Sequence, residues 1–321
     1  MIVLTGGAGF IGSCLLAALN RAGRNDVLIV DSLRTNEKWK NIVGHSFIDI
    51  VSKEDFRDWM ITGDVGDVDV VIHMGACSTT TETDADYLYD NNYRYSVDVA
   101  EFAFEHGSRF IYASSAATYG GGERGYIDTD SNLRPLNMYG YSKHLFDQWV
   151  RLNDHEGRCV GLKLFNVFGP NEYHKADQAS MIFKAFNQID GSGSVRLFRS
   201  NHPSYADGEQ MRDFIYIKDV IDVVMYFMEH PTVNGIFNLG TGIARSWNDL
   251  AKAVFAALSK QSNIEYIDIP QDIASQYQNF TQADVERLKG AIPGLTFTSL
   301  EDAIADYVNG YLRKEWPYFE G

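Results

Sequence analysis

The sequence predicts an α/β fold in which a doubly wound parallel sheet is accompanied by a smaller lobe. Short β-branched runs alternate with helical stretches through the first half of the 321-residue chain, the pattern of a parallel sheet covered by helices. These runs are apolar almost throughout, which suits strands buried on both faces. We expect strands at residues 2–5, 27–31, 46–48, 69–74, 109–114 and 160–166.

A glycine-rich turn follows the first expected strand. Gly7-Ala-Gly9-Phe-Ile-Gly12 fits G-x-G-x-x-G, and with Gly6 it also fits G-x-x-G-x-x-G. Glycines let the backbone turn tightly and approach a pyrophosphate, whose charge is met by free amides at a helix N-terminus. Because the turn stands between a strand and a helical run, it predicts a dinucleotide site in a Rossmann-type fold.

The end of the second strand bears on the type of dinucleotide. Asp31 lies 19 positions after Gly12, where a carboxylate can accept from ribose hydroxyls, which favours NAD. Arg34, Lys38 and Lys40 follow within nine residues, and cations there could hold the 2′-phosphate of NADP. A solvated basic loop explains them equally well, so the residues alone leave NADP and NAD open.

The second half of the chain predicts the smaller lobe, because the alternation loosens after Gly169-Pro170. We expect a dinucleotide-binding domain of residues 1–168, rejoined by about 213–242, and a discontinuous substrate-binding lobe of 169–212 and about 243–321. Capping patterns predict helix starts at 246–249, 281–284 and 298–301. Residues 199–211 have the composition of an ordered loop or lid.

Composition excludes several classes of function. The formal net charge of -15 and the pI near 4.9 argue against nucleic-acid or anionic-membrane binding, which need a basic surface. Three cysteines without a C-x-x-C pair predict neither a disulfide framework nor a zinc site, and the eight histidines lack metal-ligand spacing. From this spacing we expect no bound metal. The first strand directly follows Met1 and no apolar stretch is of membrane-spanning length, so we expect a cytoplasmic protein.

Tyr139 and Lys143 stand four residues apart, a spacing that brings an ammonium beside a phenol on one helix face. Ser115 follows an expected strand at the carboxyl edge of the sheet, where open α/β folds bind ligands. A lysine and an oxidised nicotinamide would lower the pKa of the phenol, which could then accept an alcohol proton as hydride leaves. The Ser115 hydroxyl would orient the same oxygen, so the three residues predict hydride-transfer chemistry.

Three longer stretches carry a resemblance to a known family. Thr5-Gly-Gly-Ala-Gly-Phe-Ile-Gly12, Tyr139-x-x-x-Lys143 and Arg212-Asp-Phe-Ile-Tyr-Ile-x-Asp219-Val220 resemble the pattern of the extended short-chain dehydrogenases/reductases, and together they cover most of the chain. Residues 112–121, 137–143, 165–170, 237–242 and 277–284 resemble members that act on nucleotide sugars at C6. The resemblance implies an NADP-dependent enzyme that inverts C6 of an ADP-heptose for the inner core of lipopolysaccharide. It also implies a closed homo-oligomer, pentameric in the most similar members.

The resemblance further implies roles for individual residues. Tyr139 and Lys175 would be acid/base groups on the two faces of the sugar carbon, with Ser115 and Lys143 in support. Cofactor contacts would come from Gly6, Gly9, Phe10, Ile11, Gly12, Asp31, Ser32, Lys38, Lys53, Met74, Gly75, Ala76, Cys77, Ser78, Asn91, Lys143, Val167 and Lys175. Substrate contacts would come from Asn166, Asp177, Lys184, Phe198, Arg199, Ser200, Asn201, Arg212 and Tyr277.

Two features depart from the family pattern, and two rival functions stay open. Asp177 and Lys184 replace a serine and a histidine, and the loop after Phe198 is several residues longer, which leaves the accepted sugar open. The nearer rival is another nucleotide-sugar enzyme, such as a UDP-hexose 4-epimerase or a dehydratase. A dehydratase usually carries an Asp-Glu pair where this chain has residues 116–118. The second rival is a non-catalytic cofactor sensor, against which the intact Ser, Tyr, Lys set argues.

Overall fold

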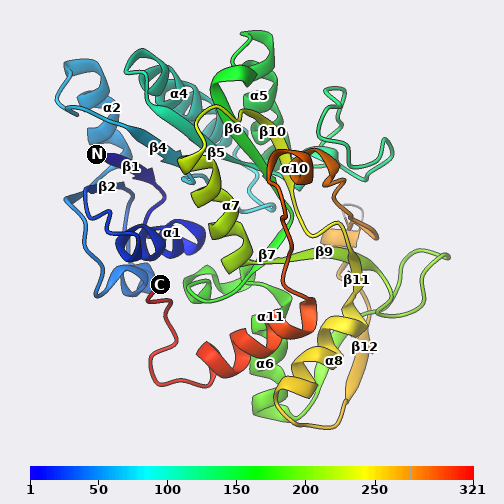
Figure 1. Cartoon of the computed structure of the whole chain (residues 1–321). Helices are drawn as coiled ribbons and strands as arrows, with labels where there is room; N and C mark the ends of the chain where they lie inside the picture. The colour runs from blue at the N-terminus through cyan, green and yellow to red at the C-terminus, as the bar shows by residue number, and fades with distance from the viewer. Residues whose placement is uncertain (275–276) are drawn as a thin grey trace.

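A computed structural model of the chain describes residues 1–274 and 277–321 (Figure 1). Its main sheet has seven parallel strands in the order β10-β6-β5-β4-β1-β2-β3. Strands β2 and β3 lie on one side of β1, and β4, β5 and β6 lie on the other. The loops that follow β1 and β4 therefore lead away from each other and leave a crevice at the carboxyl ends of these strands. The predicted doubly wound Rossmann-type sheet is confirmed.

The strands and helices alternate along much of the chain. The strands are β1 Ile2–Thr5, β2 Val27–Val30, β3 Asp49–Val51, β4 Val70–His73, β5 Arg109–Ser115, β6 Cys159–Leu164, β7 Asn166–Phe168, β8 Val195–Phe198, β9 Met211–Tyr216, β10 Gly235–Leu239, β11 Ala244–Ser246 and β12 Ile264–Ile267. The α-helices are α1 Phe10–Arg21, α2 Lys53–Thr62, α3 Ala85–Leu88, α4 Tyr95–Glu105, α5 Met138–Leu152, α6 Met181–Ser192, α7 Ile217–Glu229, α8 Trp247–Ala257, α9 Gln271–Ala274, α10 Glu286–Ala291 and α11 Leu300–Tyr307. Shorter 3-10 or π turns are η1 Glu37–Ile42, η2 Tyr89–Arg94, η3 Ala116–Tyr119, η4 Glu156–Arg158, η5 Tyr173–Gln178 and η6 Val308–Leu312.

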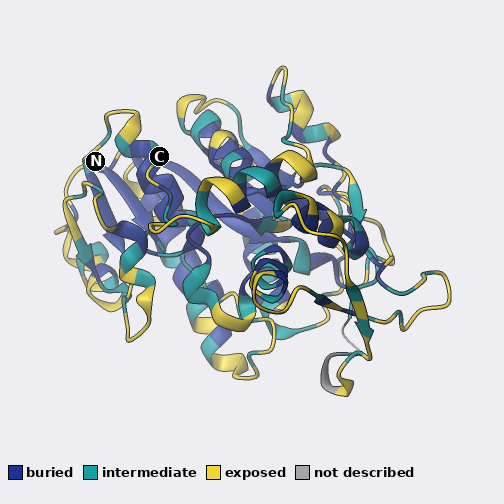
Figure 2. Ribbon diagram, turned by 90° about the horizontal axis from the view of Figure 1, so that it is seen from below, coloured by how far each residue is buried: buried dark blue, intermediate teal, exposed yellow. Residues whose placement is uncertain are grey.

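Helices cover both faces of the main sheet, which is why its strands are apolar throughout. One apolar core joins α1 and α7 to one face, and a second joins α2, α4 and α5 to the other. The burial view shows the strands as the darkest layer, with exposed residues on the outer turns of the helices (Figure 2). The buried sheet therefore gives a rigid platform for side chains at its carboxyl edge.

The smaller lobe gathers below the sheet in Figure 1, where α6, α8 and α11 lie together. Its core is continuous with the α1 and α7 side of the main sheet. Two small sheets complete it: β11-β9-β7, and the parallel pair β12-β8. Residues 199–210 form the predicted loop between β8 and β9. None of the described helices is long and apolar enough to span a membrane.

Three local predictions are wrong in position. The strand expected at 46–48 lies at Asp49–Val51, because pairing with β2 starts at Asp49 and Ile48 is 56% exposed. The helix start expected at 281–284 is absent, and α10 begins at Glu286 because Thr281 accepts instead from the Asp213 amide. At 298–301 the cap is one residue later, at Ser299, since the Thr298 hydroxyl donates to Asp219. The capping box at Ser246 is confirmed.

Candidate active site

The glycine turn between β1 and α1 has the close backbone packing that a phosphate cradle requires. Gly6 has a φ of +68°, and a Cβ there would lie 2.8 Å from the Cα of Gly75. A Cβ on Gly12 would lie 2.1 Å from the carbonyl oxygen of Gly6. Gly9 caps α1 without any side-chain hydrogen bond, so the first amides of the helix remain free for an anion. The turn therefore fits the diphosphate of a dinucleotide.

Asp31 and Lys38 form a close ion pair at the ribose end of this cradle. The Nζ of Lys38 lies 2.5 Å from Asp31 Oδ1, and the carboxylate also accepts from the amides of Ala8 and Ser32. Both side chains are largely buried, at 17% and 8% exposure. The carboxylate that favours NAD is thus neutralised by a cation suited to a 2′-phosphate.

The loop after β4 closes the other side of the cradle. The amide of Gly75 donates to Thr5 Oγ1 at 3.0 Å, and this hydroxyl also contacts His73 Nδ1 at 2.7 Å. Further on, Cys77 exchanges two backbone hydrogen bonds with the side chain of Asn92, at 2.8 and 2.9 Å. The small residues 75–78 are thereby held against the glycine turn.

Tyr139 and Lys143 lie one turn apart on α5, as the spacing predicted. Asn137 starts this helix, since its side chain accepts from the amide of Gly140 at 2.8 Å. Lys143 is buried, and its Nζ donates to the carbonyl oxygen of Ala113, two residues before Ser115 at the end of β5. The Ser115 side chain lies near the phenol of Tyr139 and acts to lower its pKa. Helix α5 and strand β5 therefore bring the predicted Ser, Tyr, Lys set together.

The pKa of Tyr139 differs from the sequence-based expectation. Burial raises the pKa of its phenol, and the influence of the nearby Ser115 side chain opposes this rise only in part. Burial also lowers the pKa of Lys143 to about 8, against the opposing charge of Asp147. The protein alone does not favour the phenolate, because desolvation penalises a charged phenol more than its surroundings compensate. The positive nicotinamide of a bound oxidised cofactor would lower the pKa of the phenol, as expected from the sequence.

Lys175 lies in η5, which follows β7. Its Nζ stands 5.5 Å from the centre of the Phe10 ring, at the start of α1. Burial lowers the pKa of Lys175, and the buried carboxylate of Glu172 opposes that shift. The next residue, Ala176, has a strained φ of 47°. The structure thus places Lys175 beside the glycine turn rather than in a hydrogen bond with Tyr139.

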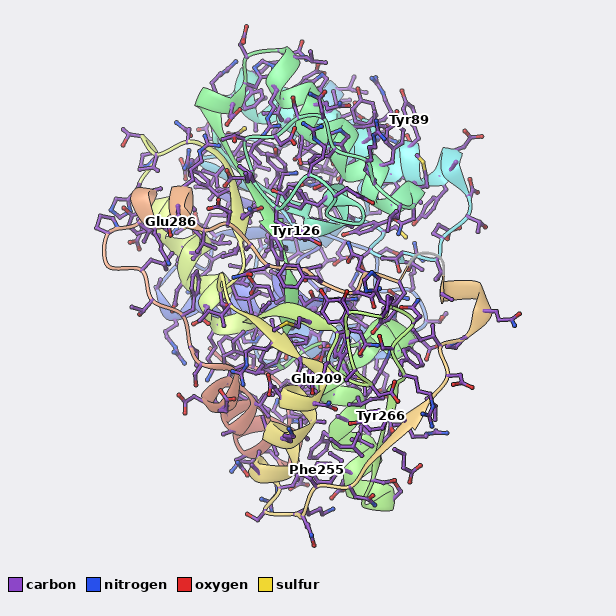
Figure 3. The ribbon with its side chains drawn as sticks, turned by 90° about the vertical axis from the view of Figure 1, so that its right-hand side faces the viewer. Tyr89, Tyr126, Glu209, Phe255, Tyr266 and Glu286 are labelled. Atoms are coloured by element: carbon purple, nitrogen blue, oxygen red, sulfur yellow. The ribbon has the colours of Figure 1, made fainter. Side chains whose placement is uncertain are left out.

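Arg212 forms the centre of an aromatic cluster in the smaller lobe. Its guanidinium lies 5.3 Å from the ring centre of Tyr277 and 5.5 Å from that of Trp247, and Phe198 packs edge-on against Tyr277. Arg212 also donates to the backbone oxygens of Met211 and Gln278. Arg212 lies on β9, and Figure 3 labels Glu209, which precedes this strand, between Tyr126 above and Tyr266 below.

Comparison with known proteins identifies the family of the chain. The model of the NAD dependent epimerase/dehydratase family matches residues 2–240. The chain belongs to this family. It is 53% identical to the ADP-L-glycero-D-manno-heptose-6-epimerase of Nitratidesulfovibrio vulgaris strain DP4 and 45% identical to that of Fusobacterium nucleatum, over 99% of this chain and 100% of each relative. The crystal structure of the Helicobacter pylori ADP-L-glycero-D-manno-heptose-6-epimerase superposes with a TM-score of 0.82 at 30% identity, covering 96% of this chain and 95% of that one.

Family membership makes a nicotinamide dinucleotide the cofactor, and several further predicted cofactor residues follow the carboxyl ends of β3 and β4. Lys53 at the start of α2 lies 3.2 Å from Asn91 Oδ1, so these two come together. Met74, Ala76 and Ser78 lie in the loop after β4, and Val167 lies on β7. Asn166, at the start of β7, pairs with Phe214 of β9 within the three-stranded sheet of the smaller lobe.

Several predicted substrate residues already have protein partners. Arg199 pairs with Asp207 and Asp268, and Lys184 donates to the backbone oxygen of Asp177. The amide of Ser200 donates to Asp207, and Asn201 donates to the backbone oxygen of Ala274. Arg212, Phe198 and Tyr277 form one cluster, whereas residues 199–201 lie in the loop beyond it.

Three buried polar residues near Ser115, Tyr139 and Lys143 were not predicted from the sequence. Asn92, fully buried, joins the Cys77 backbone to the hydroxyl of Ser142, which donates to the carbonyl oxygen of Tyr139. Asp147 and Lys163 form an ion pair below Lys143. Asp147 could have been noticed because it continues the i, i+4 series from Tyr139 and Lys143. A lysine inside an apolar strand is the corresponding signal for Lys163.

Proposed function

We propose that the chain is an ADP-glyceromanno-heptose 6-epimerase. It interconverts ADP-D-glycero-D-manno-heptose and ADP-L-glycero-D-manno-heptose by transient oxidation at C6, for the inner core of lipopolysaccharide. The observation that carries this proposal is full-length identity of 45–53% to relatives of that name. The assembled Ser115, Tyr139 and Lys143 support it, because they provide the proton path that oxidation of a secondary alcohol needs.

The cofactor in this proposal is NADP. The free amides of α1 would hold its diphosphate, and Lys38 would hold its 2′-phosphate while neutralising Asp31. When bound, the nicotinamide supplies reversible removal and return of hydride. Because hydride leaves and returns to the same carbon, the reaction has no net redox change.

The residues of this chain handle the proton and the sugar. On one face of C6, Tyr139 takes the hydroxyl proton, while Ser115 orients the same oxygen and Lys143 stabilises the phenolate. On the other face, after the 6-keto sugar has rotated, Lys175 gives a proton to the C6 oxygen as hydride returns to C6. In the structure its Nζ rests over Phe10, so this role requires Lys175 to turn toward the sugar. The Arg212 cluster would hold the nucleotide, since a guanidinium can donate bidentately to a diphosphate.

The direct test is incubation of the purified protein with ADP-D-glycero-D-manno-heptose in D₂O, followed by NMR of the C6 diastereomers. We expect the two epimers to interconvert without deuterium at C6, because hydride is retained on the protein. Conversion of UDP-hexoses in its place would support a 4-epimerase or dehydratase. No turnover of any nucleotide sugar, with tightly bound nicotinamide, would support a cofactor sensor.

Tyr139→Phe is the matched variant, since it removes one hydroxyl and keeps the ring. Loss of a general acid/base costs about 10²- to 10⁴-fold in kcat. Bound nicotinamide, released on denaturation, should stay at the level of the unaltered protein. A fully active variant would refute the role of the phenol. We also propose a closed homo-oligomer, which native mass spectrometry would test, and a monomer would refute it.

A further inference from the structure

Asp147 is a buried carboxylate directly below the catalytic pair. It lies on α5, one turn after Lys143 and two after Tyr139, and its side chain is 1% exposed. Oδ1 accepts from the Tyr112 hydroxyl at 3.0 Å. Oδ2 accepts from the Ser114 hydroxyl at 2.7 Å and from Lys163 Nζ at 2.6 Å. Three strong donors thus hold one carboxylate in a fixed position.

Lys163 continues this network toward the active site. It lies on β6 with no exposed surface, and its Nζ also donates to Thr118 Oγ1 at 2.9 Å. The Thr118 hydroxyl in turn donates to the carbonyl oxygen of Ser115 at 2.8 Å. An unbroken chain of hydrogen bonds therefore joins Asp147 to Ser115.

Each of the last three residues of β5 is held by one member of this group. Lys143 bonds the carbonyl oxygen of Ala113, Asp147 bonds the hydroxyl of Ser114, and Lys163 reaches Ser115 through Thr118. Stability alone does not explain the arrangement, because a buried ion pair can often be replaced by apolar residues without loss. The group also contains two buried lysines for one carboxylate. Its placement fits a role in the active site.

We propose that Asp147 is a positioning residue for the reaction: it sets the end of β5 beneath Tyr139 and supplies the negative charge that Lys143 needs to stay an ammonium. Lys163 is the second cation that pairs with this carboxylate. Through Thr118 it also fixes the position of Ser115. The proposal rests on the roles proposed for Tyr139 and Lys143, and it is independent of which nucleotide sugar reacts.

The pKa values agree with this arrangement. Burial raises the pKa of Asp147, but the charge and hydrogen bond of Lys163, together with the hydrogen bonds from Ser114 and Tyr112, outweigh burial and lower it overall. Burial lowers the pKa of Lys143 to about 8, with the charge of Asp147 acting against that shift. The other titratable or charged groups around Lys143, Asp147 and Lys163 are His73, Cys77, Tyr112, Tyr119, Asp128, Tyr139, His144, Arg151 and Cys159.

The test measures the pKa of Lys143 by NMR titration of the full-length protein labelled with [¹³Cε]lysine, with the signal assigned by Lys143→Met. Asp147→Asn keeps the shape of the side chain and removes its charge, so we expect the pKa of Lys143 to fall by about one unit or more. Lys163→Gln keeps a donor and removes the competing cation, so we expect the pKa to rise. The alkaline limb of kcat should move in the same directions.

The opposite signs separate this role from a structural one. Damage to the fold would lower activity in both variants without moving the Lys143 pKa up in one and down in the other. Shifts in the same direction, or no shift, would overturn the proposal. If Asp147→Asn fails to fold, the Lys163→Gln titration decides alone, because no rise would refute the proposal.

A matched control removes another carboxylate that pairs with a lysine. Asp190→Asn acts on an exposed pair with Lys260 in the smaller lobe, and it should leave the Lys143 pKa unchanged. The NMR titration needs no substrate. If the unaltered protein does not epimerise ADP-heptose, the proposed function fails while the titration still tests the role of Asp147.

Discussion

Gly12→Ala should damage both the stability and the cofactor site, because the new methyl group has no room. Its Cβ would lie 2.1 Å from the carbonyl oxygen of Gly6 and 2.9 Å from the Cα of Gly7. Both neighbours are backbone atoms that cannot rotate away. Either α1 moves outward or the turn at Gly6 opens, and the turn's hydrogen bond from Gly9 to Gly6 is strained in both cases.

The expected cost follows from comparable overpacked sites. Forcing extra carbon into a packed interior costs about 1–3 kcal/mol, and each 1.4 kcal/mol is about tenfold in the ratio of folded to unfolded protein. The displaced helix start would also move the amides that hold the diphosphate. We therefore expect a lower free energy of unfolding in urea and a loss of most bound nicotinamide from the purified variant.

Gly290→Ala is the control for this prediction. Gly290 lies in α10, and a Cβ there would meet no atom within 4 Å. Alanine favours a helix over glycine by up to about 1 kcal/mol, so this variant should be at least as stable as the original and retain its cofactor. If Gly12→Ala unfolds at the same urea concentration and keeps its nicotinamide, the close approach at Gly6 does not constrain the turn.

Three further predictions concern the cofactor, the substrate and pH. Lys38→Ala removes the cation beside Asp31. In a fluorescence titration, the affinity for NADP should fall at least tenfold while the affinity for NAD stays the same or rises. An equal loss of affinity for both cofactors would refute the role of Lys38 at the 2′-phosphate. Arg212→Lys removes the planar guanidinium and its contact with the Tyr277 ring. The KM for the nucleotide sugar should therefore rise about tenfold, with kcat little changed. An unchanged KM would show that the nucleotide binds elsewhere. Burial lowers the pKa of His73 to about 3, so the folded state holds this ring neutral and loses stability as pH falls from about 6.5 toward 3. Urea unfolding should show a slope of about 1.4 kcal/mol per pH unit in that window, and His73→Gln should lose that part of the slope.

Local sequence patterns predicted much of the fold because they act over a few residues. The glycine turn, the apolar strands and the Tyr139-Lys143 helix face each depend on backbone geometry within one or two turns. Predictions failed where a distant partner competed for the same group. Thr281 and Thr298 match capping patterns, yet their hydroxyls bond Asp213 and Asp219 instead.

The sequence by itself determined the family, the place of the dinucleotide cradle and the presence of a phenol and an ammonium on one helix face. Those features are encoded by spacing along the chain, and spacing is preserved on folding. Only the tertiary structure decided which buried groups surround that pair. Asp147 and Lys163 are 16 residues apart and Asn92 and Ser142 are 50 apart, and both pairs meet because the sheet and α5 stack against each other. Burial, which no local pattern measures, then set the directions in which the pKa values of Tyr139 and Lys143 move.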